Sequence, residues 1–368
     1  MSVRIRRLAA WTAGALALAV VAAALVAWFG SGNACDHPAA VRGDAMRAIV
    51  HCDYGPPEVL KLETVEKPVP GDGEILVRVR AASLNPLDWH LMRGEPYVGR
   101  TTMGLRKPKS TRFGVDFAGT VVAVGSNVTA FGPGDEVFGA KTGALAEFVA
   151  VRADRAVVRK PASLTFEQAA AIPVAAVTAL QGLRDEGKLK PGQKVLVNGA
   201  SGGVGTFAVQ IAKALGARVT GVCSGRNAEL VRSIGADRVI DYTREDFTKG
   251  EERYDVVLDN VGNHALSDLR RVLAPGGRYV MVGGPKGRWL DPMPRAIGAA
   301  LLSRVVRQHM GFFLARLDPA DLSFLGELAS AGKLTPVVDR RYTLGDVPEA
   351  VRYLEAGHAR GKVVVAVE

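Results

Sequence analysis

A glycine-rich turn is the feature of this sequence with the clearest chemical consequence. It follows a short apolar run at 194–198 and precedes a segment in which apolar residues recur at helical spacing. Its members are Gly199, Ala200, Ser201, Gly202, Gly203, Val204 and Gly205. Glycines let backbone approach a pyrophosphate closely, and the N-H groups and positive dipole end of the following helix attract its charge. The order strand, turn, helix predicts a dinucleotide site; the simpler alternative is a tight turn with packing glycines.

The end of the next apolar run, 218–223, indicates which dinucleotide is bound. An acidic residue there would bind the 2'-hydroxyl of NAD. The sequence has Ser224, Arg226 and Asn227 instead. A guanidinium beside hydroxyl and amide donors suits a 2'-phosphate, so NADPH is expected in preference to NADH. The alternative is that Arg226 is an ordinary solvent-exposed charge.

Thr165 and Gln168 have the spacing of a capping box, which predicts the start of a helix. After this point the sequence alternates between predicted strands and helices, and these elements position the turn. Short apolar runs predict strands of a parallel α/β sheet buried on both faces. They lie at 195–198, 218–223, 238–241, 255–259 and 278–282. Between 46 and 161, short strands punctuated by Gly and Pro predict a mostly β domain. The tail, with helices after Pro319 and at 348–356 and a final run at 363–367, is expected to return to that first domain.

Composition excludes several classes of protein. The chain has 368 residues, 48% of them apolar and 23% charged, which is typical of a folded protein with two domains. Its net charge of +10 is scattered and accompanied by no nucleic-acid-binding motif, so no nucleic-acid partner is expected. Cys35, Cys52 and Cys223 lie far apart without a CxxC pair. They predict neither a disulfide framework nor a four-thiolate zinc site, and nothing in them indicates an oxidising compartment.

The N-terminal residues predict a membrane segment. Residues 8–30 carry no charge, and as a helix they would span roughly 34 Å. Trp11 and Trp28 lie near its ends and arginines precede it, which favours a retained single-pass helix. The alternatives are a cleaved signal peptide ending before Cys35, a twin-arginine export signal, or a true start at Met46.

The arginines create a conflict over location. They favour a cytoplasmic N-terminus, which would place the remaining domains outside the cytoplasm, where NADPH is scarce. Because of the cofactor, the catalytic domains are expected to be cytoplasmic and membrane-anchored. They are expected to be cytoplasmic and soluble if translation starts at Met46.

The region around the turn also resembles a known family. The matching residues are Gly192, Gln193, Leu196, Ala200, Ser201, Gly202, Gly203, Gly205, Gln210 and Lys213. Together they resemble the quinone oxidoreductase (zeta-crystallin) signature of the medium-chain dehydrogenase/reductase superfamily, and the resemblance covers 46–368. It implies a GroES-like catalytic domain (46–164 and 315–368) and a Rossmann domain (165–314), a doubly wound parallel sheet. Residues 1–45 would be the anchor and linker.

The resemblance also bears on metal chemistry. In the zinc alcohol dehydrogenases, the sister branch, the ligand positions correspond to Asn85, Val115 and Val174, and valine cannot bind a metal. No zinc is therefore expected, and Asp116 is expected to be structural. Without a Lewis acid, reduction of a quinone or an α,β-unsaturated carbonyl by NADPH is favoured over alcohol oxidation. The alternatives are a non-catalytic, membrane-tethered NADPH-binding adaptor and an NAD(P)-dependent alcohol dehydrogenase.

The resemblance implies roles for individual residues. Tyr97 and His90 are candidate proton donors, with a rim residue as the alternative for each, and Asn85 would orient the ribose or the substrate. The remaining implied positions concern the cofactor: Ser201, Gly202, Gly203 and Val204 for the pyrophosphate, Ser224, Arg226, Asn227 and Tyr242 for the 2'-phosphate, Val261 for the adenosine, and Thr178 and Gly283 for the nicotinamide side. A homodimer is also implied.

Overall fold

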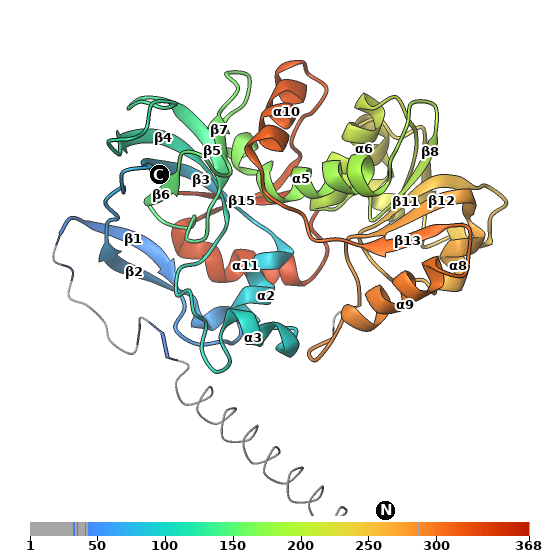
Figure 1. Ribbon diagram of the computed structural model, residues 1–368, viewed down its shortest axis with the longest axis horizontal. Helices are drawn as coiled ribbons and strands as arrows, with labels where there is room; N and C mark the ends of the chain where they lie inside the picture. Colours follow the sequence, from blue (N-terminus) through green and yellow to red (C-terminus); the bar gives the residue numbers. More distant parts are fainter. Residues whose placement is uncertain (1–31, 34, 36–40, 42, 286, 368) are drawn as a thin grey trace, which may run out of the picture.

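Two sheets lie side by side in the computed structural model, which describes residues 32–33, 35, 41, 43–285 and 287–367 (Figure 1). One sheet has six strands and the other seven, and a separate pair, β1 (Ala45–Val50) and β2 (Lys61–Glu66), packs nearby. No helix in the described part of the chain is both long and apolar enough to cross a bilayer. The anchor predicted at 8–30 lies outside the described residues.

The six-stranded sheet is parallel, as the sequence predicts. Its order is β10-β9-β8-β11-β12-β13. The strands are β8 (Lys194–Asn198), β9 (Arg218–Cys223), β10 (Arg238–Asp241), β11 (Tyr254–Asp259), β12 (Leu273–Met281) and β13 (His309–Phe312). Only β13, which is four residues long, was not predicted. The order reverses between β8 and β11, and in open α/β sheets ligands bind at the carboxyl ends of the strands at such a point.

The helices of this region connect its strands. They are α6 (Gly203–Ala214), α7 (Ala228–Ser233), α8 (Leu266–Arg271) and α9 (Met293–Ser303). Upstream, α4 (Phe166–Ala170) begins at the predicted capping box: the Gln168 amide donates to the Thr165 hydroxyl over 3.2 Å, and the Thr165 amide donates to the Gln168 side chain over 3.0 Å.

The seven-stranded sheet combines strands from the first half of the chain with the last two strands. Its order is β14-β15-β3-β4-β5-β7, with β6 also paired to β3. The strands are β3 (Glu74–Leu84), β4 (Asp116–Val124), β5 (Glu136–Ala140), β6 (Phe148–Arg152), β7 (Val157–Arg159), β14 (Val338–Thr343) and β15 (Lys362–Ala366). Because β15 pairs antiparallel with β3, the predicted return of the tail is confirmed. The exact domain boundaries stay a prediction.

The helices around this sheet bring it against its neighbour. They are α2 (Pro86–Arg93), α3 (Arg100–Met103), α5 (Pro173–Gln181), α10 (Pro319–Ser330) and α11 (Val347–Glu355). One apolar core includes Phe138 of β5, Ala176 of α5, Phe207 of α6 and Leu322 of α10. This shared core holds the two sheets in a fixed relation, with α5 between them (Figure 1).

A disulfide joins Cys35 to Cys52. The interpretation that the cysteines form no disulfide was wrong for this pair, since their separation of 17 residues hid the contact. Cys52 lies just beyond the end of β1, and the Asn33 side chain donates to its carbonyl over 2.6 Å, so the chain before β1 folds back on this point. Cys223 remains a buried free thiol. The sequence analysis found nothing in the cysteines to indicate an oxidising compartment, and this disulfide removes that argument.

Candidate active site

The glycine-rich turn links β8 to α6 at the point where the strand order reverses. Gly199 has a φ of +78°, a conformation that L side chains rarely adopt. A Cβ on Gly205 would lie 2.1 Å from the Gly199 carbonyl oxygen, so only glycine fits where the helix crosses the turn. No side chain caps α6, so the first N-H groups of this helix have no side-chain acceptor. The arrangement leaves room and donors for an anion such as a pyrophosphate.

The end of β9 borders this turn. The Asn227 side chain donates to the Ser201 hydroxyl over 3.0 Å, which joins the 2'-phosphate candidates to the turn. Its other atom, Oδ1, is buried without a hydrogen-bond partner in the described structure. Arg226 is exposed, and the Tyr242 side chain is 59% exposed on the adjoining loop. An orphaned polar atom, an exposed cation and a helix N-terminus without a side-chain cap are features that a dinucleotide fits.

The loop after β11 is held by Asp259, which the sequence analysis missed. This fully buried carboxylate at the end of β11 accepts hydrogen bonds from the amides of Val261 (3.1 Å) and Gly262 (2.9 Å). The Tyr279 hydroxyl donates to it over 2.9 Å, and burial raises the pKa of that tyrosine. Gly283 is required close by, because a Cβ there would lie 2.2 Å from the Asn260 carbonyl oxygen. In the sequence, the position of Asp259 at the end of the apolar run 255–259 could have indicated its role.

Asn85 lies between β3 and α2, beside the seven-stranded sheet. Its side chain donates to Asp116 over 2.8 Å and accepts from Lys362 over 2.5 Å, and its backbone amide donates to Asp88 over 2.7 Å. All four residues are buried. Both the nitrogen and the oxygen of the Asn85 side-chain amide are hydrogen-bonded within this cluster. The side chain is therefore held in one orientation.

Lys362 was also missed, although a lysine directly before an apolar terminal run was a visible signal. It begins β15, and its stem would lie 3.3 Å from a Cβ on Gly203. The Lys362 stem therefore lies beside the glycine-rich turn, and its ammonium reaches the Asn85 side chain. Burial lowers the pKa of Lys362 and raises the pKa of Asp116, while burial raises the pKa of Asp88 to about 7.

This cluster does not suit zinc. Its groups are one amide, two carboxylates and an ammonium, and the side chains of Val115 and Val174 offer no electron pair. The Val174 amide donates to Asp116 over 3.1 Å, so one carboxylate oxygen is already committed to backbone. Asp116 thus fixes α5 against β4, which agrees with the structural role expected for it.

The proton-donor candidates lie along and after α2. The Tyr97 ring packs edge-on against Trp289 with centroids 5.1 Å apart, and its amide donates to the Arg288 carbonyl over 2.7 Å. These contacts join the loop after α2 to the loop after β12 across the cleft. His90 Nδ1 lies 3.0 Å from the Glu95 carbonyl oxygen, so Nδ1 carries a proton there. Tyr97 and His90 are both partly buried, and the His90 ring stacks on Trp89.

Thr178 lies on α5, and its hydroxyl donates to the Val174 carbonyl over 2.7 Å. This is the usual bond of a threonine within a helix. The structure brings Asn227 to Ser201, Lys362 to Gly203 and Val261 to Gly199. The roles of Thr178, Tyr97 and His90 toward a cofactor stay predictions.

Comparison with known proteins agrees with this architecture. The profile of the alcohol dehydrogenase GroES-like domain matches residues 71–162, and that of a zinc-binding dehydrogenase matches residues 234–365. The mitochondrial NAD(P)H oxidoreductase RTN4IP1 of Mus musculus is 38% identical, over 89% of this chain and 90% of its own length. The chloroplastic NADPH-dependent alkenal/one oxidoreductase of Arabidopsis thaliana is 36% identical, over 87% of this chain and 79% of its own. The quinone oxidoreductase structure from Coxiella burnetii superposes with a TM-score of 0.78 at 32% identity, covering 88% of this chain and all of that one.

The chain belongs to the medium-chain dehydrogenase/reductase superfamily, in its quinone oxidoreductase branch. Membership makes it an oxidoreductase that uses a nicotinamide nucleotide.

Proposed function

We propose that this protein is a metal-independent NADPH reductase of quinones or α,β-unsaturated carbonyls. The observation that carries the proposal is the position of Lys362 and Asn85 beside the open N-terminus of α6. A pyrophosphate on the turn leaves the nicotinamide to extend toward this cluster. The names of the relatives, NADPH-dependent alkenal/one oxidoreductase and quinone oxidoreductase, support the same substrate classes.

The cofactor supplies the hydride, and the chain binds, orients and dries the site. Ser224, Arg226, Asn227 and Tyr242 hold the 2'-phosphate, and the backbone amides from Ser201 to Val204 hold the pyrophosphate. Val261 borders the adenosine, and Thr178 and Gly283 border the nicotinamide side. Asn85 is fixed by Lys362 and Asp116 and sets the shape of the pocket floor.

Reduction places negative charge on the substrate oxygen, which then needs a proton. Tyr97 and His90 are the proposed donors. Tyr97 can donate directly from its hydroxyl. His90, with its Nδ1 proton held by a carbonyl, must first be protonated at Nε2 to act as an acid. We expect Tyr97→Phe to lower kcat about 100-fold and His90→Gln to have the smaller effect, as measured by steady-state assays. Unchanged rates in both variants would remove these side chains from the mechanism.

The function is tested by steady-state assays with NADPH and NADH against a panel of quinones, enones and alcohols. Turnover of quinones or enones, favoured with NADPH, is expected. Tight NADPH binding without any turnover would instead support a non-catalytic NADPH-binding adaptor. Zinc in the active purified protein, with alcohol oxidation, would support an alcohol dehydrogenase.

Assembly and location remain predictions. A homodimer is expected, and light scattering of the purified protein measures it. Anchoring by residues 8–30 is tested by N-terminal sequencing of the native protein. An intact segment supports a membrane-anchored enzyme, and an end at Met46 supports a soluble one.

A further inference from the structure

The outer face of α9 and its flanks carries an apolar stripe that nothing in the described structure covers. The exposed residues recur every four positions, which places them along one side of a helix. Their exposed fractions are 73% for Trp289, 44% for Met293, 54% for Ile297, 58% for Leu301 and 80% for Val305, with Leu290 beside them at 54%. A contiguous exposed apolar surface of this kind marks an interaction site.

The helix α9 is apolar on both faces, since Ala299 is buried and Ala296 and Leu302 pack against the core beside it. Its one charged residue, Arg295, is turned inward, with its side chain 13% exposed. There the guanidinium lies 3.1 Å from the Tyr279 hydroxyl and 3.7 Å from the Asp259 carboxylate. Apolar packing and the contacts of Arg295 therefore both hold the inner face of α9 to the sheet, while its outer face carries the exposed apolar side chains.

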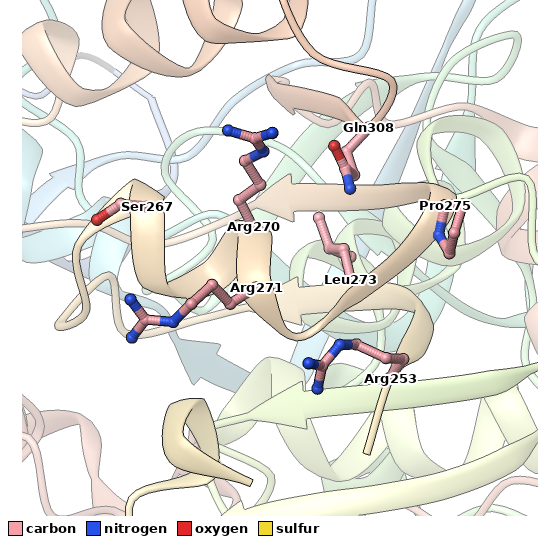
Figure 2. Close-up of a pocket in the computed structure, with 7 residues that line it drawn as sticks. All are labelled: Arg253, Ser267, Arg270, Arg271, Leu273, Pro275 and Gln308. Carbon is pink, nitrogen blue, oxygen red and sulfur yellow. The ribbon is translucent and has the colours of Figure 1, made fainter. Parts of the chain in front are cut away.

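Cationic residues flank the stripe at both ends. Arg288, whose side chain is 72% exposed, precedes it, and exposed Arg304 and Arg307 follow its helix. Beyond this end of α9 lies a hollow of about 530 Å³. Figure 2 shows the side chains around it, which include Arg253, Arg270, Arg271 and Gln308. The hollow adjoins α9 because a Cβ on Gly298 would lie 3.4 Å from Leu266, one turn before Arg270 on α8.

We propose that α9 docks on an anionic phospholipid surface, with the stripe in the headgroup region and the flanking arginines on lipid phosphates. A helix with an apolar face, a terminal tryptophan and nearby arginines is suited to that interface. A second copy of the chain is the less favourable occupant. A symmetric contact would bring two sets of arginines together, whereas lipid phosphates neutralise them.

The start of the described chain lies on the same side of the molecule (Figure 1). Asn33 is bonded to Cys52, Tyr54 to Gly104 after α3, and Arg100 lies over the rings of both Tyr54 and Tyr97. Tyr97 in turn contacts Trp289 at the head of the stripe. The uncharged residues 8–30 therefore precede a point that is connected, contact by contact, to α9.

Docking would also bring Tyr97, a proposed proton donor, close to the lipid surface, because its ring packs against Trp289. If the proposed reductase function holds, on which this consequence rests, the substrates it favours are quinones or enones with long apolar tails that reside in the bilayer.

The test is a depth measurement on the full chain reconstituted into vesicles of phosphatidylcholine with or without phosphatidylglycerol. Ile297→Cys is labelled with a fluorophore and challenged with nitroxide-labelled lipid. Val69→Cys, at a position that is 87% exposed between β2 and β3, is the matched control. The native cysteines do not compete, because two are in the disulfide and Cys223 is buried. We expect quenching at position 297 but not at 69, and stronger quenching with phosphatidylglycerol.

Variants that remove a positive charge test whether the arginines contribute to docking. Arg304→Gln and Arg307→Gln should each lower the docked-to-undocked ratio about fivefold in phosphatidylglycerol vesicles. Equal, weak quenching at 297 and 69 would overturn the proposal. So would a dimer in light scattering that Leu301→Glu dissociates, because a second copy would then cover the stripe.

A separate readout distinguishes docking from catalysis. Reduction of a water-soluble, short-chain quinone should be the same for Leu301→Glu and the unsubstituted chain. No reduction by either, together with lipid quenching at 297, would defeat the proposed function and leave docking supported.

Discussion

The amide of Asn85 is held between charged groups that water does not reach. Asp88, Asp116 and Lys362 surround it, and all are buried. Removing such groups from water disfavours their charged forms, which is why burial raises the pKa of both carboxyl groups and lowers the pKa of the ammonium. The cluster therefore couples protonation to the stability of the cleft.

The coupling can be measured as the pH dependence that Asp88 gives to the free energy of unfolding. Burial raises its pKa from 3.8 to about 7, so between about pH 4 and pH 7 the folded state binds more protons at this site than the unfolded state. The contribution of Asp88 to the free energy of unfolding is thus fully present below pH 4 and is lost as the pH rises through 7. Asp88→Asn should make the free energy of unfolding fall less steeply as the pH rises. The fall that remains is expected to come from Asp116.

Urea unfolding at a series of pH values measures the effect. Glu251→Gln, at an exposed position, is the control and should keep the wild-type slope. An unaltered slope in Asp88→Asn would show that this carboxyl group does not carry the coupling.

Arg226 is the residue that we propose sets the preference for NADPH over NADH. It is exposed, next to Asn227 at the end of β9, so a 2'-phosphate can reach it. Arg226→Ala should raise the KM for NADPH about ten- to hundredfold, since it removes a charge-assisted hydrogen bond, and should leave the KM for NADH unchanged. Arg218→Ala, at the opposite end of β9, is the control. Equal losses with both nucleotides would contradict a 2'-phosphate role.

At the scale of elements, two glycines of the turn between β8 and α6 are expected to have different roles. Gly205 is needed for packing, and Gly202 is needed for cofactor binding. A Cβ on Gly205 would meet the Gly199 carbonyl oxygen at 2.1 Å, but one on Gly202 would meet it at 3.5 Å, an ordinary contact. Gly205→Ala should lower the free energy of unfolding by about 1–3 kcal/mol without cofactor, because backbone must shift. Gly202→Ala should fold normally but bind NADPH more weakly, because its methyl group meets the pyrophosphate.

Thermal unfolding without cofactor and calorimetric titration with NADPH measure the two effects. If both variants lost stability equally and kept their affinity, the glycines would serve packing alone.

At the scale of the whole molecule, the disulfide fastens the segment before β1 to the catalytic half. Closing a loop of 17 residues restricts the unfolded chain, so Cys52→Ser should lower the free energy of unfolding by about 3 kcal/mol. Urea unfolding with and without reductant measures this. Reductant should destabilise the unsubstituted chain and leave Cys52→Ser unaffected, whereas insensitivity of both would show that the bond does not form in the isolated protein.

Local patterns in the sequence determined much of this protein. The strands of the parallel sheet, the glycine-rich turn and the capping box at Thr165 were predicted because each depends on neighbouring residues, whose spacing is visible along the chain. The return of the tail was likewise predicted, because no further strand and helix pair followed.

Tertiary structure alone decided which distant residues meet. Lys362 joins Asn85 across 277 positions, the Tyr279 hydroxyl on β12 reaches Asp259 on β11, and Cys35 reaches Cys52. The apolar side of α9 could not be assigned to the surface from its sequence, because an apolar helix face normally predicts burial. Both faces of α9 are apolar, so only tertiary packing decides which one is buried. Ala299 and Leu302 pack against the core on the face where Arg295 meets Asp259.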